Sequence, residues 1–237
     1  MGLTMDQAEE LAAAANHLAN NMNATASDVG QVLQRQGAVL KAAGLSDTQG
    51  AALAASMLSG GAAEEVPATA SKNFVRALTA GGAASKTQKA ALEAIGVHDP
   101  ERLAKAMQVA PEKAIMMVLE RLQGVEAHKQ MAVMTQLFGS ESVGGIAPLI
   151  ANLDNLAGAF ELVRNKSDYA DSLEQEFEAM GSTTKNQAKK AAEGLKMMAT
   201  TVGSILLPPI NQFLATMAPL AMQLAKFAQE NQKVTTA

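Results

Sequence analysis

The stretch from Thr184 to Gln229 reads TKNQAKKAAEGLKMMATTVGSILLPPINQFLATMAPLAMQLAKFAQ. It holds two stripes of apolar residues, each advancing by alternating steps of three and four. The first stripe is Ala188, Ala191, Leu195, Met198, Val202 and Ile205, and the second is Ile210, Phe213, Met217, Leu220, Leu224 and Phe227. This spacing gathers side chains on one narrow seam of a helix, the pattern by which helices pair side by side. We therefore predict two long amphipathic helices, each with a seam that needs a partner.

A double proline separates the two stripes. Neither Pro208 nor Pro209 can donate a hydrogen bond to a helical ladder, and Pro209 disfavours the α conformation at Pro208. The step from Ile205 to Ile210 is five residues, so the register of the stripe changes at the same place. We predict that the two helices meet here at a corner or a hairpin.

The composition favours a fold built of helices. Hydrophobic residues make up 48% of the 237 residues but aromatic residues only 3%, so the apolar content is mostly alanine, leucine, methionine and valine. Small side chains and strong helix formers favour packed helices over a sheet. The chain has no cysteine, which argues against a disulfide framework or a thiolate metal site. A net charge of −4, with 19 basic residues spread along the chain, argues against specific nucleic-acid binding.

Local capping signals divide the chain before Gly181 into about a dozen short helices. Gly44 and Gly96 are each followed by an apolar residue, which is the pattern of a helix C-cap. Thr25 or Ser27 caps the second helix. Capping boxes, in which a hydroxyl residue is followed three positions later by glutamine, open three helices at Thr4 with Gln7, Ser46 with Gln49, and Ser85 with Gln88.

Prolines and glycines set the remaining boundaries. We expect the fourth helix to start near Pro67 and a later helix to be interrupted at Pro148. Leu149 to Val163 reads as one helix, and Asp168 to Met180 reads as one amphipathic helix that Gly181 ends. The predicted organisation is a compact multi-helix domain over 1–181 and the long helical pair over 182–237, continuing into a coiled coil in a longer parent protein.

The sequence lacks a catalytic constellation. His17, His98 and His128 have no metal-ligand spacing, and the glycine pairs have the context of turns rather than of phosphate-binding loops. We expect no enzymatic activity, no cofactor and no metal site. A row of acidic residues is interpreted as a solvated helix face, with binding of a hard cation as the alternative; the row is Asp168, Asp171, Glu174 and Glu178.

Methionines are frequent, and we interpret them as core filler. The alternative is a groove for amphipathic partners, which methionine side chains adapt to well. The groups are Met116 with Met117, Met131 with Met134, and Met197 with Met198.

The segment from Met197 to Ala225 carries no charged residue and is long enough to span a bilayer. It also contains three prolines, and its apolar residues form a stripe instead of covering the helix all round. We favour a paired or core helix. The alternative is a membrane-active α-helical protein, a pore former or an injected effector, that inserts residues 197–225.

Several short segments together resemble a known family. They are Gly37–Val39 with Gly44–Ser46, Ala51–Ala54 through Gly60–Ala62, Ala77–Thr79, LFGSES at Leu137–Ser142, Ile146–Leu149, and GSILLP at Gly203–Pro208. In this order and spacing they resemble the core region of tail tape measure proteins from long-tailed bacteriophages and related prophage elements. The resemblance runs from about Asp6 to Asn231, and its most specific pieces are LFGSES and GSILLP.

The resemblance implies a structural virion protein. Members of that family lie as parallel copies in the lumen of the tail tube, and their length sets the length of the tube. Implied partners are other copies of the chain, the tail tube protein, tail assembly chaperones and tail tip or baseplate proteins. The family also implies assembly in the host bacterial cytoplasm, a role in genome delivery and contact with the host membrane at infection. Tape measure proteins are much longer than 237 residues, so we expect an excised segment or a short prophage version.

Overall fold

The computed structural model describes residues 2–61 and 65–181, with side chains as far as Glu176. In this part of the chain every regular element is a helix, which confirms the all-α class. The elements are α1 (Met5–Asn21), α2 (Ala26–Ala42), α3 (Asp47–Ser59), α4 (Glu65–Thr79), the 3-10 turn η1 (Gly81–Ala83), α5 (Lys86–Ala94), α6 (Pro100–Val109), α7 (Pro111–Gln123), α8 (Ala127–Phe138), the 3-10 turn η2 (Ser140–Ser142), α9 (Val143–Ala151), α10 (Leu153–Leu162), α11 (Lys166–Tyr169) and α12 (Ser172–Gly181).

The helix α3 lies at the centre of the packing. Its sequence is almost entirely small or apolar, and every residue from Gly50 to Leu58 is buried. A helix that is apolar all round must be covered on every side, and α1, α2, α4, α9 and α10 pack against α3. Short side chains at 50–52 and 54–56 let these neighbours approach its backbone closely.

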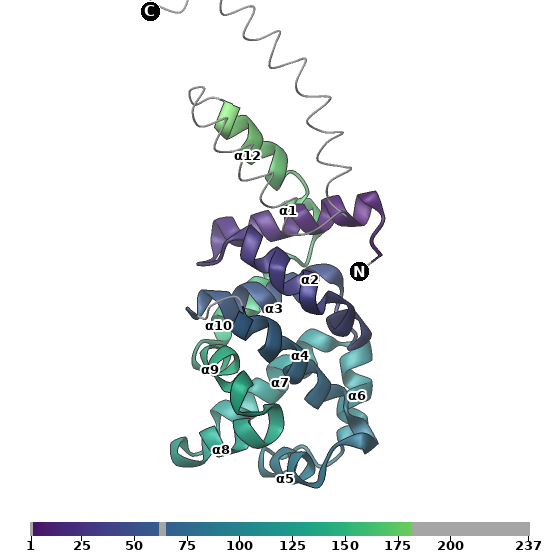
Figure 1. Cartoon of the computed structure of the whole chain (residues 1–237), viewed down its shortest axis with the longest axis vertical. Helices are drawn as coiled ribbons and strands as arrows, with labels where there is room; N and C mark the ends of the chain where they lie inside the picture. The colour runs from purple at the N-terminus through teal and green to yellow at the C-terminus, as the bar shows by residue number, and fades with distance from the viewer. Residues whose placement is uncertain (1, 62–64, 182–237) are drawn as a thin grey trace, which may run out of the picture.

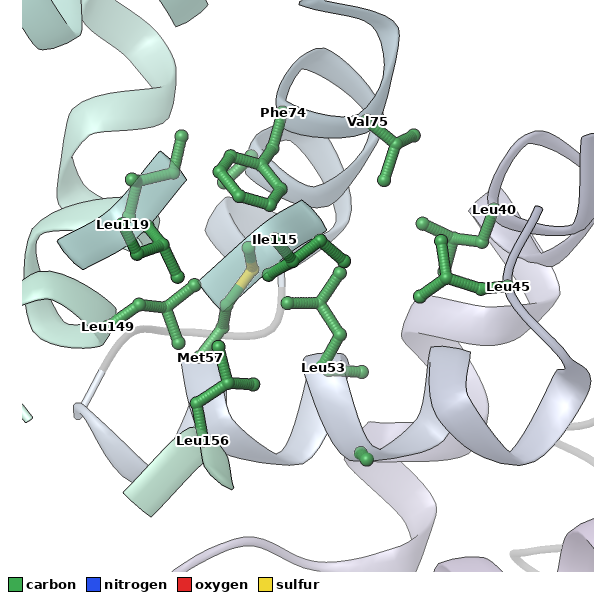
Figure 2. Close-up of a cluster of buried hydrophobic side chains, with 14 of the residues drawn as sticks. Leu40, Leu45, Leu53, Met57, Phe74, Val75, Ile115, Leu119, Leu149 and Leu156 are labelled. Carbon is green, nitrogen blue, oxygen red and sulfur yellow. The ribbon is translucent and has the colours of Figure 1, made fainter. Parts of the chain in front are cut away.

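A continuous hydrophobic core joins α3 to the helices around it. Figure 2 shows leucine, methionine, isoleucine, valine and phenylalanine side chains converging from α2, α3, α4, α7, α9 and α10. Close helix crossings depend on glycine, because a Cβ added to Gly145 of α9 would lie 2.6 Å from the Cβ of Ala70 in α4. The helices α5 and α8 pack together at the end of the domain away from α1 (Figure 1).

The predicted capping boxes are confirmed at all three sites. In each, the backbone N–H of the glutamine donates to the hydroxyl and the glutamine side chain accepts from the backbone N–H of the cap residue. For the second helix the structure decides in favour of Thr25, whose hydroxyl accepts a hydrogen bond of 3.1 Å from the N–H of Asp28.

The two predicted glycine C-caps are also confirmed. Gly44 has φ of 105° and Gly96 has φ of 74°, conformations that favour glycine. Beyond Gly44, the Leu45 N–H donates to the Leu40 carbonyl over 3.2 Å, and Val97 closes α5 in the same way. The apolar residue after each glycine is buried, so one motif both ends the helix and anchors the next link in the core.

The helix α9 continues through Pro148, so the predicted interruption at this proline is wrong. A proline removes one helical hydrogen bond, and α9 accommodates this loss with the ring packed on Gly60, where a Cβ would collide with it. The chain breaks at Asn152 instead, with φ of −141°, and the Asn152 side chain accepts from the N–H of Asn155 over 3.1 Å to cap α10. The predicted single helix over 149–163 is therefore two helices.

The predicted single helix over 168–180 is also wrong, because the chain breaks between α11 and α12. The Asp171 carbonyl accepts the first helical hydrogen bond of α12, from the N–H of Gln175 over 2.9 Å. Aspartate is one of the residues preferred at this cap position, so a local signal for the break was present. The fourth helix begins at Glu65, which places Pro67 in its first turn, close to the predicted start.

Candidate functional site

The seam residues predicted to pair helices lie outside the described residues. They comprise Ala188 to Ile205 and Ile210 to Phe227, with the break at Pro208 and Pro209. The structure does show how the chain is attached just before this segment. There, α11 and α12 pack on α1, and their polar contacts form the site considered below.

The helix α1 has two faces with different partners. Alanine and leucine side chains on one face enter the core. Glu10, Asn16 and Asn20 instead contact α11 and α12 through Lys166, Tyr169, Ser172 and Glu176, and we call these seven residues the polar junction. The residues facing the core are Ala8, Leu11, Ala14, Ala15 and Leu18.

Glu10 binds both ends of α11. The Lys166 ammonium donates to Glu10 Oε2 over 2.7 Å, and the Tyr169 hydroxyl donates to Glu10 Oε1 over 3.0 Å. The hydrogen bond from Lys166 lowers the pKa of Glu10, and the bond from Tyr169 acts in the same direction. Burial raises the pKa of Tyr169 to about 12, and the bond to Glu10 adds to this effect. Bonding to Glu10 raises the pKa of Lys166. The neutral tyrosine, the ammonium and the carboxylate are thus the mutually favoured forms.

Asn16 and Ser172 form the buried centre of the polar junction. They are 5% and 8% exposed, and the Asn16 amide donates to both the hydroxyl and the carbonyl of Ser172, over 2.9 and 3.2 Å. A buried amide without partners is costly, so this pair favours one docked position of α12 over others. Farther along, the Asn20 amide donates to Glu176 Oε2 over 3.2 Å at the surface.

Three of the four residue pairs of the polar junction share one register. Glu10 with Lys166, Asn16 with Ser172, and Asn20 with Glu176 are each separated by 156 residues. A constant separation means that the two segments advance in the same direction along each other. The last of these contacts lies shortly before residue 182, so α1 sets the direction in which the chain leaves α10 toward the C-terminal segment.

An open cleft of about 500 Å³ lies beside the polar junction, between α11, the start of α3 and the link from α6 to α7. Glu10 and Lys166 of the polar junction line it and pair with each other, and Glu112 and Arg164 form a second ion pair in it. Gln49 donates to Glu112 over 2.8 Å, and Arg164 pairs with both Glu112 and Glu161. Val109, at 85% exposed, stands at its rim. The lining residues of this cleft do not include a nucleophile next to a base. They also do not form a cluster of like charges that would bind a ligand of the opposite charge.

The structure does not bring the three histidines together. His17 lies on α1, His98 in the link from α5 to α6, and His128 in the first turn of α8. Across residues 2–61 and 65–181, no group of three or more potential metal ligands among His, Cys, Asp and Glu is placed to hold an ion. The acidic row does not lie on one helix: Asp168 belongs to α11, Asp171 to the break and Glu174 to α12, each exposed, while the side chain of Glu178 lies outside the described set.

The methionines follow the core interpretation in the described part of the chain. Met134 is buried, and Met116 and Met117 pack half-buried against the core. Met131 is 57% exposed. Met197 and Met198 lie beyond residue 181. Among the described members of these groups only Met131 is exposed, so they do not line a shared groove.

The LFGSES segment, which carries much of the resemblance, is a structural corner. Leu137 and Phe138 end α8 in the core, with the Phe138 ring 5.2 Å from that of Phe74. Gly139 then takes φ of 85°, and a side chain there would meet the carboxylate of Glu141. Asn73 of α4 donates to Glu141 and to the buried Ser142 over 3.0 and 2.9 Å. The motif therefore forms and anchors the turn from α8 into α9.

The roles of Asn16 and Asn73 were not predicted from the sequence. Both are amides within helices that otherwise read as amphipathic. For Asn16 a signal exists, since it follows the apolar run LAAAA, where an amide must find a partner once buried. The identity of the partner, 156 residues away for Asn16 and 69 away for Asn73 with Ser142, has no local signal.

Comparisons with known proteins agree with the resemblance. Residues 1–139 match the model of a family described as phage-related minor tail protein. A protein of Halomonas phage phiHAP-1, described as a probable tape measure protein, is 36% identical over all 237 residues. The match covers 27% of that protein, so the chain spans about a quarter of the length of this relative. No solved structure matches the chain. Within the described residues, no helix combines the length and the apolarity needed to cross a membrane.

Proposed function

The chain belongs to the phage-related minor tail protein family, and we propose that it is a segment of a tail tape measure protein that acts in tail assembly and tail length determination. The observation that carries the proposal is the 36% identity to a probable tape measure protein, which covers all 237 residues of the chain. The proposed role is structural, with no catalytic step. The proposed location is the lumen of the phage tail, after assembly in the host cytoplasm.

Helix geometry gives such a protein its means of measuring. A helix advances about 1.5 Å per residue, so residue number converts into length when helices run along the tube. The compact domain does not convert residues to length in this way, because its helices fold back on one another. Under this proposal the segment from 182 onward contributes length, and the compact domain contributes contacts with neighbouring proteins, such as the tail tube, tail tip and assembly chaperones.

The two seams supply the proposed contact between copies of the chain. Apolar residues at steps of three and four pair helices most simply with an equivalent helix. The first seam runs from Ala188 to Ile205 and the second from Ile210 to Phe227. The alternative of a membrane-active protein rests on residues 197–225, which lie outside the described structure, and no comparison favours it.

Tail length tests the main proposal directly. In phage particles whose tape measure contains this chain, adding about 30 helix-forming residues to the segment 182–237 is expected to lengthen the tail by roughly 45 Å. Electron microscopy of purified tails measures the change. Replacing part of the segment by a different helical sequence of the same length is the matched control and should leave tail length unchanged. Assembled tails of unaltered length after the insertion would contradict the proposal.

Light scattering of the purified chain tests the seams. We expect a defined oligomer that Leu195→Asp or Leu220→Asp reduces to monomer, because a charge on a seam cannot be buried between helices. Asn186→Asp adds a charge off the seam and should leave the oligomer intact. A wild-type monomer would contradict pairing between copies. A monomer that becomes protected from protease on liposomes would shift the assignment to membrane insertion of 197–225.

A further inference from the structure

We propose that residues 166–176 form a releasable latch on α1, which undocks as a unit while the body of the domain (residues 5–163) keeps its fold. The latch comprises α11 and the described first part of α12. Its hydrogen bonds with the body are those of the polar junction, and Tyr169 and Leu173 add apolar contacts with the core. Three features of these contacts distinguish the latch from the other helices.

The first feature is the small apolar surface that docking removes from water. Tyr169 is the one large apolar side chain of the described latch that is fully buried, and Leu173 is half-buried. Glu174 and Gln175 are exposed. In α3, by comparison, all residues from Gly50 to Leu58 are buried. Because apolar burial is the main source of cohesion between helices, undocking the latch costs far less than displacing α3.

The second feature is the dependence on a single neighbour. The main neighbour of both α11 and α12 is α1, whereas α3 packs against α1, α2, α4, α9 and α10. Figure 1 shows α12 leaving the body beside α1. Among residues 2–61 and 65–181, undocking therefore breaks mainly the interface with α1, and α1 remains held by α2, α3 and α10.

The third feature is that the contacts are polar and replaceable by water at both ends. Lys166 with Glu10 and Asn20 with Glu176 are exposed pairs. Asn16 with Ser172 is buried, so a partly displaced latch would leave the Asn16 amide without a partner. The latch is consequently favoured in two states, either docked in register on α1 or fully undocked from it. The hinge falls after Arg164, whose guanidinium stays on the body through Glu112 and Glu161.

Undocking has a consequence for a tape measure, and this consequence rests on the proposed function. A released latch would move with the segment from 182 onward and add residues 166–181 to the part of the chain that we propose contributes length. As helix these residues correspond to roughly 24 Å. The chain would then have a short and a long state of the same domain, selected by whether α1 holds the latch.

Hydrogen exchange of the full chain tests the latch. Asn16→Ala removes the buried amide and is expected to raise the exchange rates of amides in 166–176 by roughly tenfold, with amides of α3 and α7 unchanged. Asn21→Ala alters an exposed amide on the same helix and serves as the matched control. Equal acceleration in α3 and in the latch would overturn the proposal, since the latch would then open only with the whole domain.

A cross-link tests the same point from the docked state. The chain has no cysteine, so Asn16→Cys with Ser172→Cys introduces the one disulfide that the protein can form. Oxidation should suppress exchange in 166–176, and reduction should restore it, with α7 unaffected by either. Unchanged exchange in the oxidised latch would overturn the proposal. Both measurements use purified chain without tails, so their outcome is independent of the tail-length experiment.

Discussion

The helices α3 and α12 show two ways of belonging to one domain. Nearly every side chain of α3 is buried, and helices on all sides cover it. The helix α12 rests on α1, and its described contacts with that helix centre on one buried polar pair and one surface hydrogen bond. The amount of apolar surface removed from water differs greatly between the two, and with it the free energy that holds each in place. The helix α3 is therefore held more firmly than α12, which lies just before the predicted helical pair.

The largest expected effect lies in α3. Leu53→Ala removes a fully buried side chain from the core shown in Figure 2 and should lower the free energy of unfolding by about 3 kcal/mol. Urea denaturation followed by circular dichroism measures it. The control Met131→Ala truncates an exposed residue and should change stability by less than about 0.5 kcal/mol. Equal effects of the two substitutions would remove the basis of the comparison.

The next effect lies at the turn that delivers the chain into α3. Gly44 and Gly61 both have positive φ, but a Cβ at Gly44 would collide with the carbonyl oxygen of Met107, whereas a Cβ at Gly61 meets open space. Gly61→Ala should cost about 1 kcal/mol from backbone strain alone. Gly44→Ala should cost at least about 2 kcal/mol, because the collision adds to the strain. Similar unfolding midpoints for both variants would show that the Met107 carbonyl of α6 moves away from the added Cβ at little cost.

A smaller effect is expected at the edge of the domain, at Glu10. Glu10→Gln weakens the bonds to Lys166 and Tyr169 and should lower the urea midpoint by less than Gly61→Ala does. Glu9→Gln, an exposed neighbour, is the control. The pKa of Glu10 is lowered by folding, so its contribution is present above the unfolded pKa and is lost as pH falls through the folded pKa. A difference between wild type and Glu10→Gln that persists in acid would argue against this assignment.

The smallest effect at neutral pH concerns Tyr169, the single tyrosine of the chain. Its pKa of about 12 exceeds the ordinary value of 10.0, so its contribution to stability is present below pH 10 and is lost as pH rises from there to 12. Because the chain has one tyrosine, tyrosinate absorbance reports on Tyr169 alone. We expect Tyr169 to titrate at higher pH in the folded chain than in the urea-unfolded chain. Glu10→Gln should reduce the difference between these two titration midpoints. Coincident curves would mean that α11 is not docked in solution.

Much of the fold follows from signals within a few residues of each boundary. The hydroxyl and glutamine of a capping box satisfy free N–H groups that lie next to them, so Thr4, Ser46 and Ser85 mark helix starts in any surroundings. Gly44 and Gly96 end helices because the backbone there needs positive φ, which is again a local property. The composition predicted the all-α class for the same reason, since helix propensity acts residue by residue.

The sequence was misleading where a distant contact overrides a local preference. Pro148 is a helix breaker by its own chemistry, yet α9 runs through it, with the ring packed on Gly60 of a distant segment. The break in 149–163 is different, because Asn152 caps α10 through a local hydrogen bond from the N–H of Asn155, and the unbroken apolar pattern of the segment hid this signal. For the candidate site, the seams could be written down from spacing alone, whereas the polar junction could not. The pairing of the seams between copies of the chain remains a proposal.

By itself the sequence determined the all-α class, the main helix starts and stops, the two apolar seams and the family resemblance, because each depends on neighbouring residues or on collinear motifs. Only the tertiary structure decided that α3 is the centre of the packing, that Asn73 supports the LFGSES corner, and that α11 and α12 dock on α1 at a constant separation of 156 residues. The physical reason is that a hydrogen bond or a packing contact needs its partner in space. No local pattern around Asn16 or Glu10 specifies which residue, so far along the chain, will be folded against it.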